Sequence, residues 1–206
     1  MQILFVHGMG RTPLSGATLL WYLRRKGYSV NIFAYSTALE NFDSIRDRLW
    51  RKISQIAAQG EYVLIGHSLG GVLLRSALSE LPLTSKLPKH VFLLGSPVLA
   101  SRMAKKLGEN FLFRLLTGDC GQLLSSSERM AKIAGLTVPN TSIVGIKGIN
   151  GKYSPFQDEA NDGVVAVSEA SADWIGAEIR VPVIHTLLPA SLLVAKILLK
   201  VMQEND

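Results

Sequence analysis

Six short apolar runs rich in β-branched residues constrain the fold of this chain more than any other feature. They are Gln2–Val6, Ser29–Ala34, Tyr62–Ile65, His90–Leu94, Thr141–Ile146 and Ile179–Ile184. The runs are continuous rather than alternating, which is typical of strands buried on both faces of a sheet. Helix-like segments separate them, at Ser15–Lys26, Asp43–Ala58, Leu69–Leu81 and Leu187–Met202. This alternation predicts an α/β fold, in which helices cover both faces of a six-stranded, mostly parallel sheet.

The length of 206 residues suits a single domain over 1–206, and 48% apolar with 18% charged residues excludes intrinsic disorder. From 98 to 139 no strand is expected, and this helical insertion is either a lid over a site or an ordinary helix pair on the sheet. The lone cysteine, Cys120, excludes an intrachain disulfide framework. Cysteines and histidines clustered at metal-type spacings are too few for a structural zinc site, so no metal is expected, and no organic cofactor is expected either.

Charge and hydropathy patterns bear on partners and location. The net charge is +6, and a basic segment lies within 86–114, but no aromatic or glycine-rich nucleic-acid motif accompanies it, so no nucleic-acid partner is expected. The N-terminus does not resemble a signal peptide, and charges and a proline interrupt the longest apolar stretch, Val181–Met202. A cytoplasmic location is therefore expected. The last helix is expected to pack on the sheet, with weak membrane-surface association as the alternative.

The strongest chemical signal is Gly66-His67-Ser68-Leu69-Gly70, which lies between a predicted strand and a predicted helix. This is the G-x-S-x-G pattern in the strand–turn–helix setting that it requires. Glycines two positions either side of Ser68 avoid Cβ collisions in a sharp turn, and the helix N-terminus beneath the serine favours developing negative charge. Ser68 is therefore the predicted nucleophile.

A serine hydroxyl is a weak nucleophile and needs a base, for which four histidines compete. His90 opens a strand at the wrong edge of the sheet, and His7 and His67 come too early for the Ser…Asp…His order of this motif class. His185 follows the last strand and is the predicted base.

The acid that orients this base should follow the fifth strand, where Asp158, Glu159 and Asp162 lie. Asp162 sits in the tight turn Asn161-Asp162-Gly163 and is the predicted acid, whereas Asp158 and Glu159 are expected on a solvated loop. Asp119, in the insertion, is not expected to take part.

The first loop, His7-Gly8-Met9-Gly10, lacks the third glycine of a dinucleotide fingerprint because Pro13 occupies that position. We interpret it instead as an oxyanion loop, in which the backbone N–H of Met9 pairs with that of Leu69, the residue after the nucleophile.

Together, Val6-His7-Gly8-Met9-Gly10, Gly66–Gly71, Asn161-Asp162-Gly163-Val164-Val165 and His185-Thr186-Leu187-Leu188 resemble the α/β-hydrolase superfamily. The chain is similar in particular to small bacterial esterases and lipases and to the GPI-inositol-deacylase-like group. The resemblance implies nucleophile, acid and base at Ser68, Asp162 and His185, with oxyanion donors at Met9 and Leu69. The two leading antiparallel strands of the superfamily are missing here, which implies a minimal, six-stranded version.

The predicted function is a serine hydrolase that cleaves carboxylic esters, of a small-molecule or lipid kind, through an acyl-enzyme. A thioesterase or amidase would use the same triad, and a non-catalytic binding protein on the hydrolase fold is the rival from another class. Apolar residues of the insertion either line an acyl pocket or form the buried face of lid helices; they are Leu99, Met103, Leu107, Phe111, Leu112, Phe113, Leu115 and Leu116.

Overall fold

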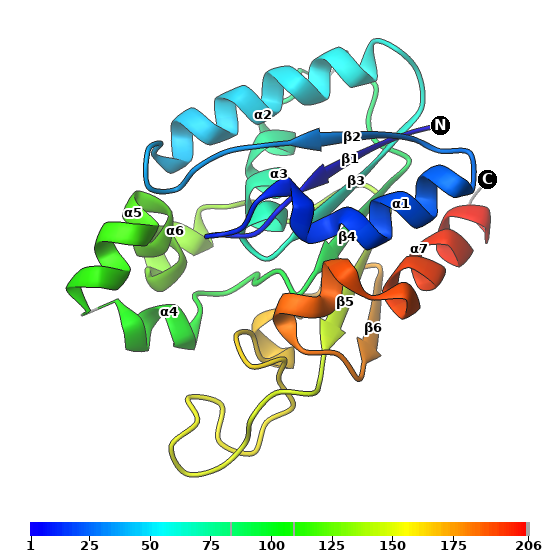
Figure 1. The fold of residues 1–206 in the computed structure, drawn as a ribbon. Helices are drawn as coiled ribbons and strands as arrows, with labels where there is room; N and C mark the ends of the chain where they lie inside the picture. The colour runs from blue at the N-terminus through cyan, green and yellow to red at the C-terminus, as the bar shows by residue number, and fades with distance from the viewer. Residues whose placement is uncertain (83, 109, 205–206) are drawn as a thin grey trace.

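The computed structural model describes residues 1–82, 84–108 and 110–204, and for 111–116 only the backbone. Its strands are β1 (Gln2–Val6), β2 (Ser29–Phe33), β3 (Tyr62–His67), β4 (His90–Leu94), β5 (Asn140–Gly145) and β6 (Ala177–Val181). They form one sheet in the order β2-β1-β3-β4-β5-β6, and every neighbouring pair is parallel (Figure 1). The predicted α/β class is confirmed, and the sheet is parallel throughout rather than mostly so.

The two edge strands differ from the prediction that all six would be buried on both faces. β3, β4 and β5 are buried along their whole length, whereas β2 and β6 each bury only their last residue. β6 also begins at Ala177, before the predicted strand, and ends at Val181, because Pro182 has no N–H to donate to the ladder. An edge strand needs fewer apolar residues, so the apolar run predicted the bounds of β6 poorly.

Helices cover both faces of the sheet, as predicted. Successive residues of a strand point to opposite faces, so Leu4 and Val6 of β1 join one core while Ile3 and Phe5 join the other. The helices α2 (Phe42–Ala57) and α3 (Leu69–Ser79) bury their apolar faces in the first core. The helices α1 (Ala17–Arg25) and α7 (Leu192–Glu204) do so in the second (Figure 1).

The last helix, α7, therefore packs on the sheet, with Val194, Ala195, Leu198 and Met202 buried. Its lysines at 196 and 200 point away from this core and are exposed. None of the helices in the described part of the chain combines the length and the apolar character needed to span a bilayer.

The insertion between β4 and β5 contains α4 (Arg102–Leu107), α5 (Phe111–Ser125) and α6 (Ser127–Ala131) and, within its described residues, no strand. Asp119 anchors it: one carboxylate oxygen accepts the Phe42 N–H at the start of α2 (3.0 Å) and the other accepts Arg129 (2.7 Å). These contacts give Asp119 a structural role. The candidate acyl-pocket side chains at 111–116 lie outside the described residues, and Leu99 and Leu107 are exposed.

Candidate active site

Ser68 lies in the turn between β3 and α3 with φ 53° and ψ −122°, a backbone conformation that non-glycine residues rarely adopt. Its N–H donates to the Leu94 carbonyl at the end of β4 (2.9 Å), which holds the turn against the sheet. A Cβ on Gly70 would lie 2.2 Å from the Val6 carbonyl oxygen, and one on Gly66 would lie 2.5 Å from the Gly71 Cα. The glycine spacing is therefore a steric requirement of this turn.

Asp162 and His185 form a buried hydrogen-bonded pair, in which His185 Nδ1 lies 2.7 Å from Asp162 Oδ2. The other carboxylate oxygen accepts the backbone N–H groups of Val164 (2.9 Å) and Val165 (2.7 Å), so both oxygens are held. The His185 N–H also donates to the Asp162 carbonyl at 2.9 Å. These contacts fix the imidazole with Nδ1 facing the acid, which leaves Nε2 as the nitrogen able to accept a proton.

Gly95 places this pair close to the nucleophile turn. A Cβ on Gly95 would lie 2.9 Å from Asp162 Oδ2 and 3.0 Å from His185 Nδ1, so the carboxyl end of β4 lies directly against the pair. The residue before it, Leu94, binds the Ser68 N–H. Within the described residues no hydrogen bond joins Ser68 Oγ to His185; catalytic hydrogen bonds of this kind are often long until a substrate binds.

The other three histidines have structural partners. His90 lies at the opposite edge of the sheet, as expected, and contacts Thr141 Oγ1 at 2.9 Å. His7 stacks on Tyr35 with ring centroids 4.3 Å apart and accepts the Tyr35 N–H at 3.4 Å. His67 packs against the His185 ring (4.8 Å) and its Nε2 lies 3.1 Å from the His185 carbonyl oxygen, to which it donates.

Burial lowers the pKa of each of these three histidines, and that of His67 falls furthest because its ring is completely buried, with a smaller effect from the neighbouring His185. Since the folded protein resists protonating them, its free energy of unfolding should fall as pH drops below about 6.5, by at most about 1.4 kcal/mol per pH unit for each histidine. Urea unfolding followed by tryptophan fluorescence at about pH 7.5 and about pH 5.5 measures this loss. An unfolding midpoint that is constant or rises on acidification would contradict it.

The loop after β1 lies against the nucleophile. A Cβ on Gly8 would come within 2.9 Å of His67 Nδ1 and 3.1 Å of Ser68 Cβ, so only glycine fits there. Leu69 is the first residue of α3, and the N–H of that position has no partner within its own helix. The Met9 N–H makes no hydrogen bond with any residue that the structure describes. Neither candidate oxyanion amide is thus engaged by a described residue; Leu69 directly follows Ser68, and Gly8, the neighbour of Met9, lies against the Ser68 side chain.

The alternative acids of the same loop lie elsewhere. Glu159 pairs with Arg102 (2.6 Å) and accepts the Ser168 N–H (2.9 Å), while Asp158 is exposed. Glu169, which sequence reasoning missed, is buried, accepts the Ala166 N–H at 2.8 Å and binds Arg102 at the start of α4. Arg102 thereby joins the insertion to the segment that carries Asp162. The sequence gives no signal that Glu169 is buried, because it is one of several acidic residues in the same segment.

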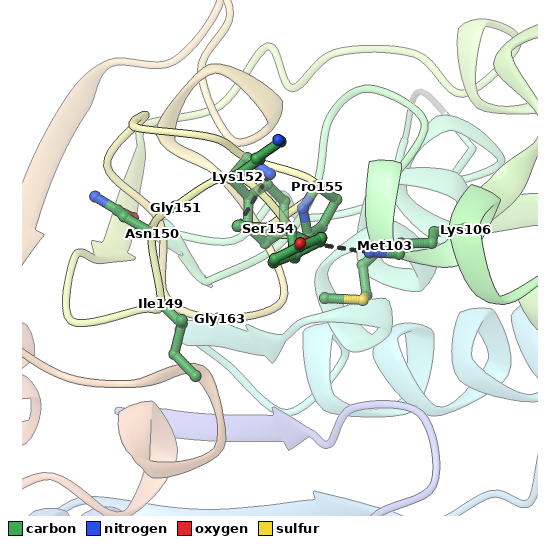
Figure 2. Close-up of a pocket in the computed structure, with 11 residues that line it drawn as sticks. Met103, Lys106, Ile149, Asn150, Gly151, Lys152, Ser154, Pro155 and Gly163 are labelled. Atoms are coloured by element: carbon green, nitrogen blue, oxygen red, sulfur yellow. Dashed lines mark hydrogen bonds between the residues drawn. The ribbon is translucent and has the colours of Figure 1, made fainter.

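A pocket of about 460 Å³ lies between α4 and the loop 149–156 (Figure 2). Its lining includes Met103, Phe156 and Gly163, the residue after Asp162, and Lys106 Nζ closes one side by donating to the Tyr153 carbonyl (2.9 Å). In the described ranges, no three histidine, cysteine or acidic side chains are grouped so that they could hold a metal ion.

The sheet order and the helices on its two faces define an α/β-hydrolase fold, and solved structures agree. A lipase from Bacillus licheniformis in its mature form matches with a TM-score of 0.74 and 18% identity over 98% of this chain and 91% of that one. A thioesterase of the prodiginine pathway of Streptomyces coelicolor matches with a TM-score of 0.66 and 15% identity over 99% and 90%.

Phospholipase PlaB from Legionella pneumophila has a TM-score of 0.65 and 16% identity over 83% of this chain, which corresponds to 46% of that protein. No protein-family model and no curated protein sequence matches the chain. At these identities the similarities establish the hydrolase fold alone.

Proposed function

We propose that this protein is a serine hydrolase of carboxylic esters, with Ser68 as nucleophile, His185 as general base and Asp162 as the orienting acid. The observation that carries the proposal is the buried 2.7 Å contact between Asp162 and His185, at the sheet edge where Ser68 occupies a strained turn. A protein that only bound ligands would not need a strained serine, a free imidazole nitrogen and a held carboxylate at one edge.

The reaction follows from these groups. His185 Nε2 takes the Ser68 proton as Oγ attacks the ester carbonyl, and the carbonyl oxygen becomes an oxyanion facing the N–H groups of Met9 and Leu69. The imidazolium, stabilised by Asp162, returns the proton to the leaving alcohol, and the acyl group stays on Ser68. Water, deprotonated by His185, then attacks the acyl-enzyme and releases the carboxylic acid.

The pocket that would take an apolar acyl or alcohol group is lined by Gly163, the residue after Asp162, and not by Ser68, Asp162 or His185 themselves. The 460 Å³ pocket borders the segment that carries Asp162, and Met103, Ile149 and Phe156 contribute apolar walls. The insertion supplies one wall through α4, so we propose that residues 98–139 act as a cap that selects substrates within one domain. A thioester is the nearest competing substrate, because the same groups would cleave it.

A panel of p-nitrophenyl esters from short to long acyl chains, together with an acyl thioester, tests the proposal. The wild type should hydrolyse at least one ester faster than the thioester of the same acyl chain, whereas the Ser68→Ala variant should hydrolyse neither. If the wild type cleaves the thioester faster than the ester, the substrate class is a thioester rather than an ester. Equal background rates for the wild type and Ser68→Ala, with both folded, would favour a binding protein.

A further inference from the structure

The most exposed large apolar residues of the described chain are concentrated at one edge of the sheet. Tyr153 (88% exposed), Leu39 (86%), Leu14 (80%) and Ile149 (80%) exceed all other exposed apolar side chains, the next being 57%. Each follows the carboxyl end of a strand: Leu14 follows β1, Leu39 follows β2, and Ile149 and Tyr153 follow β5. Exposed apolar residues scattered singly are ordinary, but a group confined to one edge indicates an interaction surface.

The remaining loops of this edge extend the group. Leu99 follows β4, and Leu187 follows β6, and both are more than half exposed. We call Leu14, Leu39, Leu99, Ile149, Tyr153 and Leu187 the apolar rim. The strand arrows in Figure 1 point toward the side of the molecule where the β2–α2 connection, the insertion and the loop after β5 follow one another. Only the turn after β3 contributes no member, and it holds Ser68.

The charges among these loops are mostly positive. Arg11, Lys105, Lys106, Lys147 and Lys152 are exposed and form no ion pair with any residue that the structure describes. The acids of the same loops and of the insertion are paired within the protein: Glu40 with Arg48, Asp119 with Arg129, Glu128 with Lys132, and Glu159 with Arg102. Among described residues of these segments Asp158 and Asp173 are both exposed and unpaired, and Asp173 lies just before β6, away from the carboxyl ends of the strands.

Exposed apolar residues and unpaired cations on the same connecting segments complement an anionic lipid surface. Leucine and isoleucine tips enter the acyl–headgroup boundary, the amphipathic tyrosine ring suits the headgroup level, and lysines nearby attract anionic headgroups. A protein partner with an acidic face would satisfy the cations but would not explain why the apolar residues are spread over five separate loops.

We propose that the apolar rim and its lysines dock this protein on an anionic phospholipid surface, with the edge that carries Ser68 facing the lipid. The contact differs from one through α7, whose apolar face is buried in the core. The proposal depends on the proposed function only in assigning the reactive site to this edge, because docking itself requires no catalysis.

Vesicle co-sedimentation with the full chain carrying Ser68→Ala separates docking from hydrolysis. Vesicles of phosphatidylcholine alone are compared with vesicles that also contain phosphatidylglycerol, at about 0.05 M and about 0.5 M salt. We expect binding to the anionic vesicles at low salt and a marked loss at high salt. Adding Leu14→Ser and Leu39→Ser should weaken binding about tenfold or more, and Lys147→Glu with Lys152→Glu should remove the preference for the anionic lipid.

Matched controls use exposed apolar residues away from this edge. Trp21→Ser with Leu87→Ser should leave binding unchanged, since Trp21 lies on α1 and Leu87 precedes β4. Absence of binding to the anionic vesicles at low salt, or equal loss in rim and control variants, would overturn the proposal. If vesicle binding is lost only in a variant with Leu192→Ser and Leu193→Ser, the contact is made by α7 and the proposal is overturned.

The outcomes also separate this inference from the proposed function. A wild type that hydrolyses soluble esters but ignores vesicles retains the hydrolase function and loses the docking surface. A chain that binds vesicles but cleaves no ester or thioester retains the docking surface and loses the hydrolase function. The Leu14→Ser, Leu39→Ser double variant on the wild-type background should keep its rate on a soluble ester, since neither residue lines the pocket, and lose rate only on vesicle-borne substrate.

Discussion

Replacing His185 with alanine is expected to lower kcat for ester hydrolysis by about 10⁴-fold or more. Without a base, the Ser68 hydroxyl keeps its proton at neutral pH. None of the other histidines among the described residues is bound to a carboxylate, as His185 is, and so none can replace it. The measurement is the steady-state rate on the ester that the panel identifies as best, with folding checked by circular dichroism.

The matched control is His90→Gln, a buried histidine at the opposite edge of the same sheet. Its kcat should stay near the wild-type value, because any effect would arise from packing around Thr141 rather than from proton transfer. If His185→Ala retains more than about 1% of wild-type activity, the assignment of the base is wrong.

Replacing Asp162 with asparagine is expected to lower kcat by about 10⁴-fold while leaving the fold intact. The amide oxygen can still accept the N–H groups of Val164 and Val165. The amide nitrogen, however, is a donor that would face His185 Nδ1 and favour the tautomer with its proton on Nε2. That nitrogen could then no longer accept the Ser68 proton, and the developing imidazolium would lose its counter-charge.

Asp158→Asn provides the control from the same loop, because this aspartate is exposed and four residues from Asp162. It should change kcat by less than about twofold. A comparable loss in both variants would show that the loop as a whole, rather than the Asp162 carboxylate, supports activity. A loss in Asp158→Asn alone would transfer the role of the acid to that residue.

Sequence patterns predicted the central strands well because those strands are buried on both faces and leave continuous apolar runs. β1 and β4 occupy the predicted residues. β6 was displaced in the prediction because an edge strand needs little apolar content, and the apolar residues after Val181 belong to the loop leading to His185.

The candidate site was predictable where local backbone geometry dictates residue type. Glycines around Ser68 and after Asp162 reflect contacts or a positive φ that only glycine tolerates, as at Gly163 (φ 97°). Contacts between distant segments left no such trace. The burial of Glu169 beneath Arg102, the His67 contact with the His185 carbonyl, and the shared edge of the apolar rim depend on the folded arrangement.

The most direct test of the account is to treat the wild type with a fluorophosphonate probe near neutral pH and map the adduct by mass spectrometry. We expect one covalent adduct, on the peptide that contains Ser68, with labelling slowed by several orders of magnitude in His185→Ala and absent in Ser68→Ala. Labelling at another serine, or none on a folded wild-type protein, would contradict the claim that Ser68 is an activated nucleophile.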